Sequence, residues 1–265
     1  MRAGRFTDLL AAEWIKLWSL RSTVWLLGLG TLAVVALAAQ SSLDAYQSWP
    51  DFTAMEKARF DPLGEAFSAL AACLVVIGAG TLGALTIVGE YATGLIRTTL
   101  VAVPARHRVV AAKLVVTGAV TLAAGALISA GTFGVSQAIL SGRGVAASPA
   151  DPGVLRVLAA NALLAPVSAL VGMGIGALVR HTAAAVVTVC AALVVVPTFF
   201  RPTVHQWLND LYALAPFYVW RTCLGLPLVR DDPALPTVAG SWAVFALWPM
   251  VAAVVAVVVV RRRDV

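Results

Sequence analysis

The sequence predicts an all-α integral membrane protein with six transmembrane helices, and three observations lead to this fold class. First, 60% of the 265 residues are hydrophobic and only 12% are charged, about half the charged fraction of a typical soluble domain. Second, the apolar residues form charge-free blocks close to the roughly 20 residues that a helix needs to cross the hydrocarbon core. Third, the charges lie between these blocks. Helices are expected because lipid offers no partners to open backbone groups.

Six blocks are long enough to span the bilayer, and they make the whole chain, 1–265, a single transmembrane domain. They cover residues 23–40, 67–88, 114–140, 157–179, 182–200 and 238–260. Arg180 and His181 leave only a tight turn between the fourth and fifth blocks.

The orientation follows from the basic residues between the blocks. With the N-terminus inside, the predicted cytoplasmic segments hold 12 of the 19 basic residues and 4 of the 13 acids, and the external segments hold the other 7 and 9. The positive-inside rule therefore predicts a multi-pass protein of the cell membrane with both termini in the cytoplasm. The net charge of +6 is explained better by contact with the lipids of the inner leaflet than by a nucleic-acid partner.

Residues 5–20 predict a helix that lies in the membrane interface. Its apolar side chains form one helical stripe, whereas Asp8, Glu13 and Lys16 fall mostly away from it. Tryptophans on such a helix lie at headgroup depth, so Trp14, Lys16 and Trp18 are the predicted anchor. A generic membrane anchor before the first span is the alternative. The stripe consists of Phe6, Leu10, Trp14, Leu17 and Trp18.

The segment between the second and third blocks is longer than a simple connection requires. Tyr91, Leu95, Thr99 and Val103 recur at every fourth residue and predict a short amphipathic helix. Pro104 then ends it, and residues 106–108, Arg-His-Arg, are expected to form a basic turn. The segment has the form of a cytoplasmic docking element, although a basic interfacial helix that only fixes the topology has the same pattern.

Residues 201–237 are too polar to span the membrane and too aromatic for a solvated loop. Pro202, Pro216 and Pro227 interrupt them. An external interfacial or re-entrant helical hairpin before the last span satisfies both conditions. Its aromatic residues are Trp207, Tyr212, Phe217, Tyr218 and Trp220.

A family resemblance rests on two of these segments and their order. Residues 90–100 read EYATGLIRTTL, Val103-Pro104 and Lys113 follow, and residues 13–17 read EWIKL. The combination resembles the membrane subunits, or permeases, of ABC transporters of the type-2 exporter family. The resemblance implies that residues 5–20 are the elbow helix and that residues 89–108 carry a coupling helix.

That resemblance also implies the partners. The coupling helix would seat on a separate ATPase subunit that binds ATP and magnesium, with Glu90, Arg97, Arg106 and Arg108 as its coupling residues. A second permease copy, identical or different, would complete the path for a hydrophobic or amphipathic cargo such as a drug, lipid or peptide. The aromatic residues of the external hairpin would form part of an external gate.

Glu90 at the inner end of the second block is costly unless it is hydrated or paired. We expect it to pair with a basic residue of the elbow helix or of 106–108, and the alternative is a carboxylate that reaches water.

Several motifs are absent or misleading. Gly78, Gly80 and Gly83 match the G-x-G-x-x-G fingerprint, but they lie inside an apolar block, where small residues favour close helix packing. The sequence has no G-x-x-x-x-G-K-[ST] loop, and its three histidines lack metal-ligand spacing. We therefore expect no catalytic, metal or cofactor site in this chain. A non-transporting sensor or scaffold is the alternative function.

Overall fold

The computed structural model describes residues 5–94, 105–196, 215–224 and 237–262, and the regular structure within these ranges is entirely helical. This agrees with the all-α prediction. In chain order, the elements are α1 (Phe6–Ser19), α2 (Arg21–Ser48), η1 (Trp49–Asp51), α3 (Ala54–Arg59), α4 (Pro62–Ala66), α5 (Ala69–Ala92), α7 (Arg106–Ser141), α8 (Val154–Val179), α9 (Thr182–Cys190), η2 (Ala191–Val195), α12 (Pro216–Leu224) and α13 (Val238–Arg262).

Five helical stretches of the described chain are long and apolar enough to cross a membrane. The predicted fifth block, 182–200, begins as a shorter apolar helix, Thr182–Val195, and its residues after 196 lie outside the described ranges. The architecture is that of a multi-pass membrane protein. The five stretches are Arg21–Asp51, Pro62–Ala92, Arg106–Ser141, Val154–Val179 and Val238–Val260.

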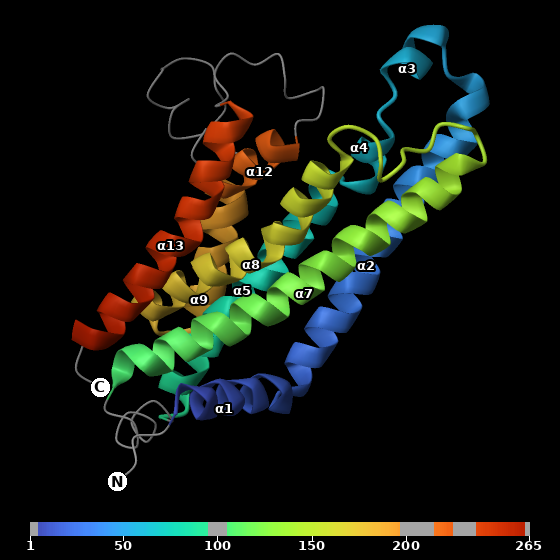
Figure 1. Ribbon diagram of the computed structural model, residues 1–265. Coiled ribbons are helices and arrows are strands. Elements are labelled where there is room, and N and C mark those ends of the chain that lie inside the picture. The colour runs from blue at the N-terminus through green and yellow to red at the C-terminus, as the bar shows by residue number, and fades with distance from the viewer. Residues whose placement is uncertain (1–4, 95–104, 197–214, 225–236, 263–265) are drawn as a thin grey trace.

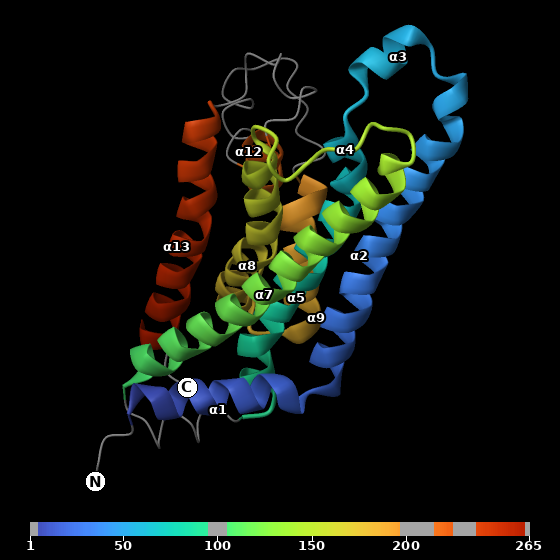
Figure 2. The same cartoon turned by 45° about the vertical axis from the view of Figure 1, so that its right-hand side comes forward.

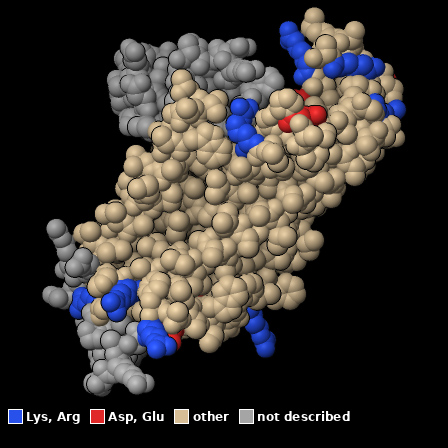
Figure 3. Space-filling model, viewed as in Figure 1, with Lys and Arg blue, Asp and Glu red and all other residues tan. Residues whose placement is uncertain are grey.

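The long helices run side by side, and α1 lies across one end of them (Figures 1 and 2). Helix α8 packs against α5, α7 and α13, whereas α2 packs against α7 and α5. The end of α13 lies at the same end of the bundle as α1 (Figure 1), which we call the α1 end. On the face drawn in Figure 3, lysines and arginines gather toward the two ends and leave an uncharged band between them. Such a band is what a lipid-facing surface requires.

Helices α5 and α8 approach closely because glycines face each other across their contact. A Cβ added to Gly83 would lie 1.8 Å from the carbonyl oxygen of Ala169, and one added to Gly172 would lie 1.9 Å from that of Gly80. Neither position can hold a larger residue unless the backbones separate. Gly80 and Gly83 therefore serve helix packing, as predicted.

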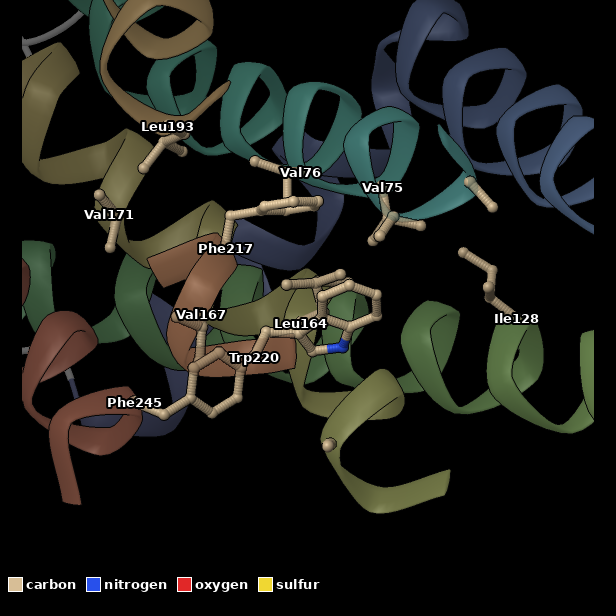
Figure 4. Packing of buried hydrophobic residues seen from close by; sticks show 14 of the residues in the cluster. Val75, Val76, Ile128, Leu164, Val167, Val171, Leu193, Phe217, Trp220 and Phe245 are labelled. Carbon is tan, nitrogen blue, oxygen red and sulfur yellow. The ribbon is translucent and has the colours of Figure 1, made fainter. Parts of the chain in front are cut away.

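The aromatic helix α12 contributes to the core near the other end of the bundle. Phe217 and Trp220 are 8% and 1% exposed, and their ring centroids lie 5.5 Å apart. They pack with Leu164 and Val167 of α8 and with Phe245 of α13 (Figure 4). The part of the predicted external hairpin that the structure describes is thus a helix with a buried face.

Two helices extend well beyond the predicted blocks. Helix α2 continues to Ser48 rather than ending near residue 40, and Ser42 inside the extension is fully buried. Its hydroxyl lies within hydrogen-bond distance of both the Ala38 carbonyl and Ser136 Oγ of α7, so the polar group is satisfied within the protein. Helix α7 begins at Arg106. The predicted basic turn at residues 106–108 is therefore wrong, since these residues form the first turn of α7.

Candidate functional site

Helix α1 turns its polar side toward the bundle and much of its apolar side away from it. Trp14 and Trp18 are 50% and 40% exposed, whereas Glu13 and Leu17 are buried at 6% each. The two tryptophan rings lie 5.6 Å apart. Exposed tryptophans fit the predicted position at headgroup depth. Glu13, in contrast, faces the protein, although the sequence pattern placed it on the polar side of an isolated helix.

Four charged side chains from three helices meet where α1 contacts α5 and α7. We call Glu13, Lys16, Glu90 and Lys113 the ion cluster. Lys16 Nζ lies 2.8 Å from Glu13 Oε1 and 2.8 Å from Glu90 Oε1. Lys113 Nζ lies 2.5 Å from Glu13 Oε2 and 3.0 Å from Glu90 Oε1. Each acid thus contacts both lysines, and the four contacts close into a ring.

The ring is neutral and mostly buried. The side chains of Glu13, Glu90 and Lys113 are 6%, 11% and 7% exposed, and only Lys16, at 38%, keeps substantial contact with the surface. Burial alone would lower the pKa of Lys16, but hydrogen bonds and attraction from Glu13 and Glu90 raise it above its ordinary value. Removing one partner from a buried pair leaves an uncompensated charge, which costs about 3–5 kcal/mol.

The local structure places each member without strain. Glu13 and Lys16 are one helical turn apart on α1, so both point to the same side. Glu90 lies in the last turn of α5, and Lys113 lies in the second turn of α7. The ion cluster therefore joins α1 to the two helices that flank residues 93–105, the connection that was predicted to dock a partner.

A second contact holds the same end of α5. Arg180 ends α8 in the left-handed conformation, with φ at 58°, and its guanidinium carbon lies 4.6 Å from the centre of the Tyr91 ring. Such a cation over an aromatic face is attracted by the ring. The turn between α8 and α9 therefore touches α5 one residue after Glu90.

The structure brings together some of the predicted site residues and separates others. Glu90 contacts Lys16 of α1, which is one of the two predicted pairings, and it is buried rather than extended into water. Arg106 Nη1 instead lies 3.4 Å from the Val260 carbonyl oxygen of α13, and Arg108 is exposed. Arg97, Trp207 and Tyr212 lie outside the described residues, as does the side chain of Tyr218.

Glu13 and Lys113 were not predicted as site residues. Lys113 was quoted only as part of the family pattern, at the edge of the third block. The spacing of Glu13 and Lys16 and the position of Lys113 just before an apolar block are the sequence features that could have suggested both. Among the described residues, no group of three histidine, cysteine, aspartate or glutamate side chains could hold a metal ion.

No protein-family model and no curated protein matches this chain.

Proposed function

We propose that this chain is the permease subunit of an ATP-driven ABC exporter, a membrane subunit that forms the path for a hydrophobic or amphipathic cargo. In this proposal it has six spans, an elbow helix, a coupling helix and an external re-entrant hairpin, and both termini lie in the cytoplasm. It works with a second permease copy and a separate ATPase subunit. The ion cluster is the observation that carries the proposal.

The ion cluster gives the connection between α5 and α7 a mechanical attachment. Glu90 precedes this connection and Lys113 follows it, and both contact α1 through Glu13 and Lys16. A displacement of the connection cannot separate these helices without exposing a buried charge to apolar surroundings. A partner that pushed on the connection would therefore move α1, α5 and α7 together.

The glycine contact extends this unit into the bundle. Gly83 of α5 and Gly172 of α8 bring the two backbones so close that α5 cannot slide without moving α8. Helix α8 in turn packs against α13 and α12, and α12 places Trp220 in the core. The packing supports transmission from the predicted cytoplasmic end to the aromatic segment at the other end.

The test is co-expression with a candidate ATPase subunit that carries a P-loop, such as one encoded by a neighbouring gene. We expect the two chains to purify together and hydrolyse ATP. Arg108→Glu, at an exposed position of α7, should weaken their association about tenfold or more if it contacts the partner. Arg59→Glu, at an exposed position of α3 near the other end of the bundle, serves as the matched control and should leave the association unchanged.

Glu90→Gln separates coupling from binding. It should leave the ATPase subunit bound but reduce the stimulation of ATP hydrolysis by cargo lipids or drugs. Purification without any nucleotide-binding partner would overturn the proposal and favour a non-transporting sensor or scaffold.

A further inference from the structure

A cavity of about 280 Å³ lies beside the ion cluster, between α1, α2, α5 and α7. One part of its wall is polar and includes Lys16 and Glu90. The rest is largely apolar and includes Leu20, Leu26 and Leu82. Leu20 is 58% exposed, so the cavity reaches the outer surface of the bundle at the level of α1.

A second cavity of about 280 Å³ lies between α2, α5 and α7, and Leu26 lines both cavities. Its walls are almost entirely apolar and include Gly30, Val75 and Ile128. Each volume is close to the lower limit of about 300 Å³ for small-molecule sites. Together the cavities change from polar at the α1 end to apolar toward the middle of the bundle. A phospholipid in the adjacent leaflet has the same order of headgroup and acyl chain.

The polar wall keeps one donor and one acceptor for a ligand. Lys16 Nζ has three N–H groups and donates to two carboxylate oxygens, those of Glu13 and Glu90. Both lysines contact Oε1 of Glu90, and Glu90 Oε2 has no hydrogen-bond donor among the described residues. The cavity therefore offers an ammonium and a carboxylate oxygen close together.

These two groups specify the headgroup. We propose that the cavities bind one phospholipid with a phosphoethanolamine headgroup, whose phosphate accepts from Lys16 and whose primary ammonium donates to Glu90 Oε2. One acyl chain would then fill the second cavity. A headgroup with a net negative charge would meet the unpaired carboxylate oxygen, and a choline headgroup has no N–H to donate. The site does not require the chain to be a transporter.

The test is native mass spectrometry of the purified chain in detergent, supplied in turn with ethanolamine, choline and glycerol phospholipids that carry identical acyl chains. We expect the ethanolamine lipid to be retained about tenfold more than the other two, because one charge-assisted hydrogen bond contributes about 1.5 kcal/mol or more. Equal retention of the ethanolamine and choline lipids would overturn the proposal.

Two glycines of α2 provide a matched pair of variants. A Cβ at Gly30 or at Gly28 meets nothing within 4 Å, but only Gly30 lines the second cavity. Gly30→Phe should reduce retention of the ethanolamine lipid about tenfold, and Gly28→Phe should retain it like the wild type. Gly78→Leu fills the same cavity from α5 and replaces Gly30→Phe if that variant does not fold. Full retention in a folded cavity-filling variant would show that the lipid binds elsewhere.

Discussion

Charge reversal within the ion cluster should follow the geometry of a ring rather than that of a pair. Glu90 contacts two lysines, and each lysine also contacts Glu13. Glu90→Lys therefore changes two of the four contacts from attractive to repulsive. Adding Lys113→Glu restores the Glu90 contact with Lys113 but makes the one between Lys113 and Glu13 repulsive. The double variant thus has the same number of repulsive contacts as the single one.

The expected magnitudes follow from the burial of these groups. A hydrogen bond to a charged group contributes about 1.5–3 kcal/mol net, and Glu90 makes two such bonds. Glu90→Gln keeps an amide oxygen as acceptor, so we expect it to lower the free energy of unfolding by about 3 kcal/mol. Glu90→Lys should cost about 5 kcal/mol or more, since it also places three cations together.

Reversal of all four residues restores four attractive contacts. We expect the fourfold variant, Glu13→Lys, Lys16→Glu, Glu90→Lys and Lys113→Glu, to recover most of the loss, whereas the double variant recovers less than half. The assay is unfolding by sodium dodecyl sulfate in mixed micelles, followed by tryptophan fluorescence. Complete recovery in the double variant would refute the ring and indicate an isolated ion pair.

Three further predictions concern helix packing, the core and pH. Gly83→Ala should lower the free energy of unfolding by about 1–3 kcal/mol, because its Cβ would clash with Ala169. Gly89→Ala is the control, since nothing lies within 4 Å of its Cβ, and equal stability of the two variants would contradict the prediction. Trp220→Ala should cost about 3–5 kcal/mol, and the same measurement on Trp25→Ala, at a 64% exposed position, should show a change within about 0.5 kcal/mol. Burial opposes the raised pKa of Lys16 and the bonds to Glu13 and Glu90 cause it, so the stabilisation is complete below the ordinary lysine pKa and is lost as the pH rises through the raised value. Fluorescence of the α1 tryptophans should therefore stay constant from about pH 6 to 9 and change only above about pH 10, and a change near neutral pH would contradict the assignment.

The sequence was sufficient to predict the five long apolar helices, because that choice depends on local composition. It was less informative about where the helices begin and end. Helix α2 continues past its apolar block, where Ser42 bonds to Ser136, 94 residues away in sequence. Helix α7 begins before its block, where Lys113 bonds to Glu13, 100 residues away. Polar residues can extend a helix beyond its apolar block when they bond to partners that are distant in sequence. Local composition does not reveal those partners.

The candidate site shows the same limit. The position of Glu90 at the end of an apolar block indicated that it needs a partner, and a residue of the elbow helix was among those expected. Periodicity placed Glu13 on the polar side of α1 and Leu17 on the apolar stripe, but both side chains are buried against the bundle. It did not indicate that the polar side of α1 faces the bundle, because periodicity gives the sides of a helix and not their surroundings. Glu13 was therefore missed as a site residue.

The reversed polarity of α1 connects the two proposals. In water, an amphipathic helix buries its apolar side, but a helix at the membrane surface can leave tryptophans to the lipid and use its charges for protein contacts. Lys16 would then serve both the ion cluster and the bound headgroup. A lipid that favours the closed ion cluster binds more tightly when the cluster is intact, and it stabilises the cluster by the same free energy. Two measurements would report that one coupling. Glu90→Gln should abolish the preference for the ethanolamine lipid, and it should destabilise the protein less in lipid-free detergent than in the presence of that lipid.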